Sequence, residues 1–260
     1  MVAYKRHHFM TIANKLMRLV SGTALGWCLL TSTTLHAEDE ISIPTFTAHY
    51  DLLRNDSMKL GEVKRTTTVQ QDGTIKFESH SKTTGLAAFF IKDRIAEHSI
   101  FRLDQGSIQP QDYLYDRTGG KRLSTTKLKF DREKKSITDA SNGEVWNVKM
   151  PTGMQDKLSY QLQLMLDLQA GLTTFSYPVA DDGILKEYRF TFLGEEKIKT
   201  AIGEIDTIKL KRERAADSKR KLTIWFAKSL RYLPVRIKQG KNDKEFITLE
   251  IKQTKGIRPK

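Results

Sequence analysis

The sequence predicts a mainly β protein: an antiparallel curled sheet or half-open barrel of about a dozen strands with one amphipathic helix. Three observations predict it. Most segments after residue 45 alternate apolar and polar residues, turn-forming residues separate these segments, and a single segment has helical spacing instead. A sheet of this size must curl or fold over to cover its edges, so a barrel, a half-barrel or a sandwich follows.

The strands follow from the alternation. In the first strand, Phe46, Ala48, Tyr50 and Leu52 share one face. The dipeptides Asp-Gly at 72–73 and Asn-Gly at 142–143 are strong hairpin signals. Further strands are expected at 61–69, 75–79, 95–103, 113–117, 123–131, 136–139, 187–193, 205–213, 221–226, 235–239 and 246–253.

The helix is predicted between residues 156 and 170, as the longest helix of the mature protein. Its apolar residues recur with helical spacing at Leu158, Leu162, Met165 and Leu166, and Leu168 and Leu172 extend the set. Asp156 is the expected N-cap, and Gly171 is the expected residue just past the end. A second short helix or turn is expected over the apolar residues 85–91, as a mobile lid or lip.

The first 37 residues are predicted to be a signal peptide. Four basic residues and no acid precede an apolar stretch at 19–30, and its longest apolar run is well short of the roughly 20 residues that span a bilayer. Cleavage is expected after Ala37, which leaves one β-rich domain at 38–260 in the periplasm of a Gram-negative-type bacterium, without a transmembrane segment. A lipid anchor on Cys28 is the competing outcome, and the bulky Trp27 argues against it.

The predicted mature chain is basic. Removing the four basic residues of the leader from the 44 in the sequence leaves 40, against 31 acidic residues. This balance favours contact with anionic lipid head groups, lipopolysaccharide phosphates or acidic polysaccharide, and the compartment excludes nucleic acid as a natural partner. Solubility alone is the alternative explanation of the charge.

No cofactor, metal site or catalytic residue is predicted. Cys28 is the single cysteine and is removed with the leader, which excludes disulfides, thiol chemistry and cysteine-liganded metals. His49, His80 and His98 form no HxH or HExxH pair and are interpreted as solvent-facing strand residues. Ser99 follows His98 directly, so the two side chains point to opposite faces of a strand and cannot pair. The acidic pairs at 181–182 and 195–196 are interpreted as turn residues.

Several fragments, taken in order, resemble a family of exported proteobacterial proteins described as a domain of unknown function. The resemblance covers nearly all of the mature chain and implies a secreted all-β or half-barrel domain, but it transfers no catalytic residue. The fragments are Tyr50, Gly61-Glu62, Gly85-Leu86-Ala87, Asp93-x-Ile95-x-Glu97-x-Ser99, Tyr113-x-Tyr115, Gly119-Gly120, Gly153, Asp156-x-Leu158-Ser159, Trp225-Phe226 and Tyr232-Leu233-Pro234-Val235-Arg236.

The candidate ligand-binding residues lie within these fragments. They are polar groups in or beside apolar patterns, which must pair with each other or with a ligand if they point inward, together with two aromatic residues expected at a barrel rim. A network that only specifies the fold is the alternative. The candidates are Asp93, Arg94, Glu97, Tyr113, Tyr115, Asp156, Trp225, Tyr232 and Arg236.

Three functions fit the sequence. The first is a periplasmic protein that binds or carries an amphiphilic or envelope-derived ligand, a lipid or an envelope glycan, on its concave apolar face. The alternative is an envelope structural or interaction protein, whose basic strands at 209–212 and 219–221 dock on an anionic surface or a protein partner. An enzyme that acts on envelope polymers through Asp93, Glu97 and Asp156 is the third.

Overall fold

A computed structural model describes residues 41–90, 92–140, 146–181, 183–214, 218, 220–241 and 245–257, the side chains of residues 146 and 147 excepted. The strands of this part form one antiparallel sheet in the order β8-β7-β6-β5-β4-β3-β2-β1-β14-β13-β12-β11-β10-β9. The strands are β1 (Thr47–Arg54), β2 (Met58–Val69), β3 (Ile75–Thr83), β4 (Arg94–Asp104), β5 (Ser107–Thr118), β6 (Ser124–Asp131), β7 (Ser136–Asp139), β8 (Trp146–Lys149), β9 (Phe175–Asp181), β10 (Ile184–Thr200), β11 (Gly203–Arg212), β12 (Lys221–Ala227), β13 (Leu233–Gly240) and β14 (Phe246–Lys255).

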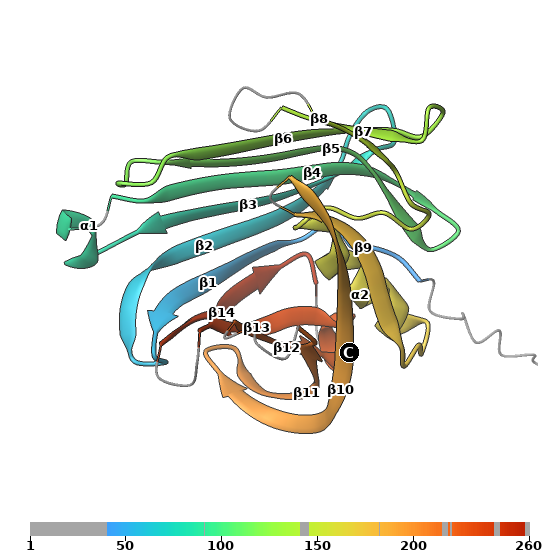
Figure 1. Cartoon of the computed structure of the whole chain (residues 1–260). Helices are drawn as coiled ribbons and strands as arrows, with labels where there is room; N and C mark the ends of the chain where they lie inside the picture. The colour runs from blue at the N-terminus through green and yellow to red at the C-terminus, as the bar shows by residue number, and fades with distance from the viewer. Residues whose placement is uncertain are drawn as a thin grey trace, which may run out of the picture. The chain divides into compact units, whose positions relative to one another are not determined.

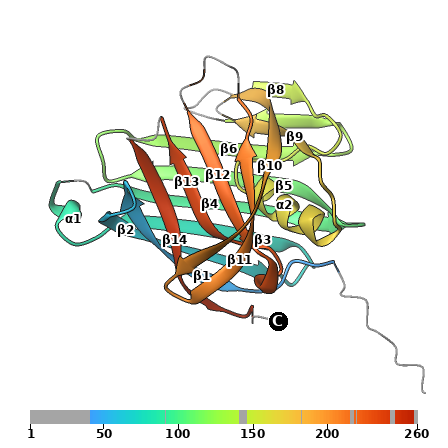
Figure 2. The same ribbon diagram turned by 90° about the horizontal axis from the view of Figure 1, so that it is seen from below.

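The predicted fold class is confirmed. The sheet is not closed, because its two end strands, β8 and β9, do not pair with each other. It curls instead, so that β2 to β6 lie across from β11 to β14 (Figure 1). Figure 2 looks past β12 to β14 onto β3 to β6, whose strands run in a crossing direction, with α2 (Ser159–Gln169) lying between the two halves.

The predicted strands include neither the short strand β8 nor β9. Strand β9 lies at one end of the sheet. It contains Pro178, which cannot donate a hydrogen bond to a neighbouring strand, and such a residue is tolerated at a sheet edge. The outer edge of β9 is covered locally by the chain before α2. The Gln155 amide donates to the Pro178 carbonyl over 2.8 Å, and the Gln155 carbonyl accepts from the Ala180 amide over 3.0 Å.

Helix α2 is the predicted helix, but it begins later than expected. Asp156 is not the N-cap residue, since Leu158 takes that position. The Asp156 carboxylate instead caps the preceding turn, accepting from the Leu158 and Ser159 amides over 2.8 and 2.7 Å. The predicted end is confirmed: Gly171 has a φ of 72°, and the Leu172 amide donates back to the Asp167 carbonyl over 2.9 Å.

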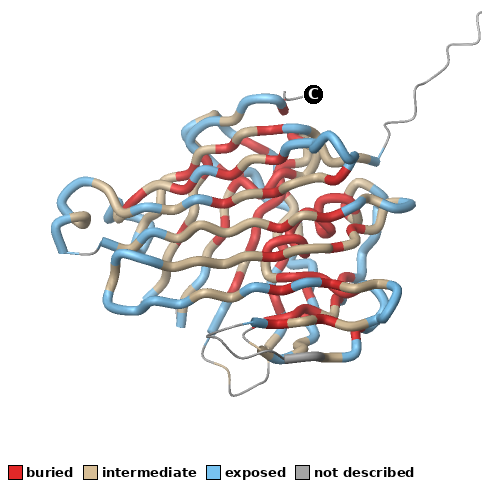
Figure 3. Tube along the Cα trace, turned by 90° about the horizontal axis from the view of Figure 1, so that it is seen from above, coloured by how far each residue is buried: buried red, intermediate tan, exposed pale blue. Residues whose placement is uncertain are grey.

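The helix is buried on nearly every side, which corrects the prediction of an amphipathic helix. Leu158, Leu162, Met165 and Leu166 are at most 1% exposed, as expected. The polar side is covered too, because the sheet curls around it: Gln161 and Gln163 are buried, and Gln163 accepts from the Ile108 amide over 2.7 Å. Leu172, in contrast, is 50% exposed. Figure 3 shows that the buried residues gather around this helix.

The turn predictions had mixed outcomes. The Asp-Gly turn at 72–73 is confirmed, with Gly73 at a φ of 78°. The pair Glu195–Glu196 is not a turn but lies within the long strand β10. A short helix, α1 (Ala87–Phe90), covers part of the predicted segment 85–91. A 3-10 helix, η2 (Lys228–Leu230), joins β12 to β13.

The signal peptide at 1–37 and the Asn-Gly turn at 142–143 lie outside the described residues, as do one residue each of the predicted segments 85–91, 181–182 and 219–221. Within the described part of the chain, no helix is long and apolar enough to cross a membrane.

Candidate functional site

A cavity of about 850 Å³ lies on the concave side of the sheet, beside the first turn of α2. Its walls come from β1, β2, β4 and β5 on one side and from β9 to β14 on the other. Nine basic and three acidic residues line it, which leaves an excess of six positive charges. The charged lining residues are Arg54, Arg65, Arg117, Lys157, Lys186, Arg212, Arg214, Arg220, Lys241, Glu97, Asp181 and Glu245.

A polar row crosses β2 to β5 on this concave face, where Arg65, Ser79, Glu97 and Tyr115 are register neighbours. Arg65 is only 7% exposed. Its Nη1 donates to the Gln161 side chain of α2 over 2.9 Å, and its guanidinium lies 5.6 Å from the centre of the Tyr50 ring. Its Nε has no hydrogen-bond partner among the described residues.

Two carboxyl groups, Glu97 in this row and Asp156 behind it, accept hydrogen bonds from side-chain hydroxyls. The Tyr113 hydroxyl donates to Glu97 over 2.6 Å, and the Ser99 hydroxyl donates to Asp156 over 2.6 Å. Burial raises the pKa of Glu97 above its ordinary value. Burial also raises the pKa of Asp156 to about 6, although hydrogen bonds from Ser99 and from two backbone amides oppose the shift. The negative charge of Glu97 adds to the shift of Asp156, so these acids are electrostatically coupled.

The opposite wall carries a second buried arginine. Arg212 is 6% exposed, and the Cζ of its guanidinium lies over the Tyr188 ring, 3.0 Å from the ring centre. The Tyr188 hydroxyl donates to Asp181 over 2.7 Å. Arg212 has no ion pair with a described residue, and burial together with the charge of Arg212 lowers the pKa of the neighbouring Arg214.

The Asp181 carboxylate partly balances the positive charge of this wall. Lys157 and Lys186 both pair with it, at 3.3 and 2.8 Å. Burial alone would raise the pKa of Asp181, but hydrogen bonds from Lys186 and Tyr188, together with the charges of both lysines, lower it to about 2. Asp181 is therefore already paired with two lysines. Arg212, in contrast, is left without an ion pair to a described carboxylate.

Four of the nine predicted site residues come together here. Glu97 and Tyr115 line the cavity, and Tyr113 and Asp156 lie behind it. Asp93 forms an ion pair with Arg117, which lines the cavity toward the loop between β3 and β4.

Arg94 does not belong to the cavity, because its side chain is exposed and lines a different groove, together with His49 and His80. In the described part of the chain, no three His, Cys, Asp or Glu side chains gather as a metal site.

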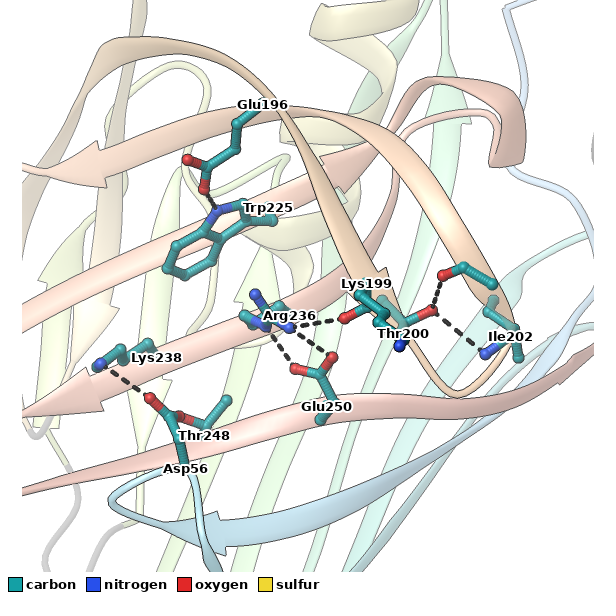
Figure 4. A network of polar contacts seen from close by, with 11 residues as sticks. Asp56, Glu196, Lys199, Thr200, Ile202, Trp225, Arg236, Lys238, Thr248 and Glu250 are labelled. Atoms are coloured by element: carbon teal, nitrogen blue, oxygen red, sulfur yellow. Dashed lines mark hydrogen bonds and ion pairs between the residues drawn. The ribbon is translucent and has the colours of Figure 1, made fainter.

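Trp225 and Arg236 line a second pocket of about 530 Å³, and neither lines the cavity. Figure 4 shows both residues with their polar partners. The Trp225 indole donates to Glu196, and Arg236 pairs with Glu250 at 2.7 Å between Nη2 and Oε1. Arg236 Nη2 also donates to the Lys199 carbonyl over 3.1 Å, which ties the β10–β11 hairpin to β13.

Tyr232 lies in the turn before β13, with its amide bonded to the Ala227 carbonyl over 2.8 Å. Pro234 is the second residue of β13, a strand start as predicted.

The sequence interpretation missed the arginines of the cavity. The basic segment at 209–212 is predicted to dock on an anionic surface or a protein partner, but within it Lys211 is exposed while Arg212 is buried. The signal was present, since Arg212 shares its strand face with Leu210, which is fully buried. Arg65 likewise lies on the same face as Val63 and Thr67 of β2.

The fold and the cavity define a class of protein: an unclosed β-barrel-like domain with a basic interior. The chain belongs to the family described as a protein of unknown function, DUF3108, whose model matches residues 45–248. A crystal structure of a β-barrel-like protein of domain of unknown function DUF1849 from Brucella abortus is similar, with a TM-score of 0.51 at 8% identity. The match covers 83% of this chain and 98% of that chain.

Two structures of MucB also align, one in complex with periplasmic MucA and one a MucA/MucB complex from Pseudomonas aeruginosa. Their TM-scores are 0.17 and 0.18 at 10% identity. The alignments cover 84% and 86% of this chain and 94% and 96% of those chains, and scores this low do not support a shared fold. The comparison with curated proteins gave no match.

Proposed function

We propose that this domain binds an anionic amphiphile in the cavity between the concave sheet and α2. The observation that carries the proposal is the pair of buried arginines, Arg65 and Arg212, which have no ion pair with a described carboxylate. An unpaired buried charge is costly, so a phosphate or carboxylate head group between these two walls would satisfy both guanidinium groups.

The apolar part of the ligand is expected along the remaining wall. Strands β12 to β14 contribute Leu222, Ile237, Ile247 and Leu249 to the cavity lining, beside the basic residues. The cavity volume of about 850 Å³ lies within the range of small-molecule sites, which is roughly 300 to 1,000 Å³. A ligand with a charged head group and a short apolar tail would place the head group against the basic lining and the tail against strands β12 to β14.

The compartment is part of the same proposal. Basic residues followed by an apolar stretch at 19–30 favour a signal peptide at 1–37 and a periplasmic domain. Anionic amphiphiles are abundant at the membranes that border this compartment. The domain would then hold or carry such a molecule between them.

The proposal is tested by native mass spectrometry of the protein purified from its own envelope. We expect the wild type to carry a bound molecule, and lipid extraction to identify a phosphate or carboxylate head group. The double variant Arg65→Met/Arg212→Met should fold and lose this molecule, because the methionines keep the volume but remove the charges. The control Arg102→Met changes an exposed arginine of β4 outside the cavity and should keep it.

Two results would contradict the proposal. One is a wild-type protein that carries no amphiphile and takes none up when an anionic detergent-like lipid is added. The other is a double variant that binds as well as the control, since the buried arginines would then have no part in recognition.

A further inference from the structure

Two neighbouring loops at one end of the sheet form a surface that we call the tip, defined as residues 84–90 and 119–123. The first loop joins β3 to β4 and contains α1, and the second joins β5 to β6. Figures 1 and 2 both show α1 at the end of β3 and β4 that lies away from α2.

The two loops are packed against each other. Gly119 lies so close to the chain of the first loop that an added Cβ would be 2.1 Å from the Lys92 carbonyl oxygen, and Gly120 lies against the Asp93 side chain. Asp93 in turn pairs with Arg117 at the end of β5. The tip is therefore held as one surface by backbone contact and by an ion pair.

The tip displays apolar side chains to solvent. Leu86, Phe89, Phe90 and Leu123 are 80%, 77%, 88% and 74% exposed, and no other large apolar side chain among the described residues exceeds 64%. A monomeric domain rarely gathers its most exposed apolar side chains at one place unless they contact another apolar phase.

Exposed basic residues, which we call the collar, flank these side chains in the sequence. Lys82, Lys92, Arg94, Lys121 and Arg122 are all exposed, and the single acid of segments 82–94 and 117–123, Asp93, is paired with Arg117. Apolar side chains flanked by lysine and arginine are typical of segments that enter the interface of an anionic membrane. A protein partner would need a matching acidic rim around an apolar pocket. An anionic bilayer has negative head groups and apolar acyl chains across its whole surface.

We propose that the tip docks the domain on an anionic phospholipid membrane, with Leu86, Phe89 and Phe90 inserted among the acyl chains and the collar on the head groups. The docked surface is close to the cavity along the chain, because Ile95 and Arg117 line the cavity and lie in the strands β4 and β5 that lead to the tip. Docking would therefore place the cavity next to the lipid. The attachment itself requires only the tip and not a ligand in the cavity.

The experiment is sedimentation with vesicles of phosphatidylcholine alone and of phosphatidylcholine mixed with phosphatidylglycerol. We expect the wild type to sediment with the mixed vesicles and to be released by high salt. The variant Phe89→Ser/Phe90→Ser should bind at least about tenfold more weakly. Its control, Phe192→Ser/Leu193→Ser, changes two exposed apolar residues of β10 outside the tip and should bind as the wild type does.

The collar is tested with charge reversals of equal size. Lys121→Glu/Arg122→Glu should abolish binding to the mixed vesicles, whereas Lys127→Glu/Lys129→Glu, at exposed positions further along β6, should weaken it only slightly. Equal loss in both variants would overturn the proposal, because attraction would then depend on net charge and not on the tip.

The remaining outcomes separate this proposal from the cavity proposal. Arg65→Met/Arg212→Met should still sediment with the mixed vesicles, because these residues are buried away from the tip surface. A wild-type protein that stays in solution with both vesicle types would contradict membrane docking, even if the tip then binds a second copy or an envelope protein.

Discussion

The concave face of the sheet has two regions that differ in what covers them. Near α2, Phe77, Ser99 and Tyr113 are register neighbours that are at most 2% exposed and form part of a packed core. One layer further along the same strands, Arg65, Glu97 and Tyr115 border an open cavity. The same curled sheet therefore builds a packed core where it encloses the body of α2 and a charged cavity beside the first turn of that helix.

The two ends of the half-barrel therefore differ in the property to which each should contribute. The helix supplies apolar volume to one end of the half-barrel, and its first-turn residues Tyr160 and Gln161, with Lys157 just before the helix, line the cavity at the other. Stability should then depend on the packed end and recognition on the open end. Variants that separate the two properties give the sharpest comparison.

The largest expected effect is at the packed end. Leu162→Ala removes a side chain that is 1% exposed in the centre of α2, and such a truncation should lower the free energy of unfolding by about 2 to 5 kcal/mol. Denaturant unfolding measures it. Leu172→Ala is the matched control, since Leu172 is 50% exposed and should cost far less. Similar losses in both variants would show that α2 is not the centre of the core.

A somewhat smaller loss of stability is expected at the second pocket. Trp225 is 6% exposed and lies between Lys209 and Arg236, at 4.9 and 5.8 Å from its ring centre. Trp225→Ala should lower the free energy of unfolding by about 3 kcal/mol and leave cavity binding unchanged. Thermal unfolding and ligand titration of the same preparation measure both. A Trp225→Ala variant that keeps its stability but loses ligand binding would indicate that the ligand binds in this pocket.

The free energy of unfolding should depend on pH through Asp156, which lies between the packed core and the cavity. Asp156 has an ordinary pKa of 3.8, which rises to about 6 in the folded state, so the folded protein binds the proton more tightly than the unfolded chain. The contribution of this group to stability is fully present below pH 3.8 and is lost as pH rises through about 6. Asp156→Asn keeps the shape of the side chain and should make this decline shallower.

The measurement is the unfolding free energy as a function of pH. Asp206→Asn serves as a control, because Asp206 is an exposed residue of β11 outside the cavity. Part of the decline should remain in Asp156→Asn, since burial also raises the pKa of Glu97. An unchanged profile would show that Asp156 does not carry the effect.

Much of the fold followed from local pattern, and the exceptions have physical reasons. Alternation located most strands because one face of each is buried against the core. It missed β9, where Pro178 is acceptable only because the strand lies at the sheet edge. It also treated Gln161 and Gln163 as a solvent-facing side, which is correct for a surface helix but not for one enclosed by a curled sheet.

The site was predicted in part for a similar reason. Glu97, Tyr113 and Asp156 stood out because each is polar within an apolar pattern. Arg212 comes from β11, which faces β2 and β4 only after the sheet has curled, and no local pattern encodes that distance. Trp225 lies in another fragment of the same resemblance, and the structure places it in a different pocket.

The central claim is that buried arginines recognise a negative head group. The most direct measurement compares the dissociation constants of two lysolipids with the same tail, lysophosphatidylglycerol and the zwitterionic lysophosphatidylcholine. We predict at least about tenfold tighter binding of the anionic lipid, or about 1.4 kcal/mol, and loss of that difference in Arg65→Met/Arg212→Met. Equal affinity of the wild type for both lipids would contradict the claim.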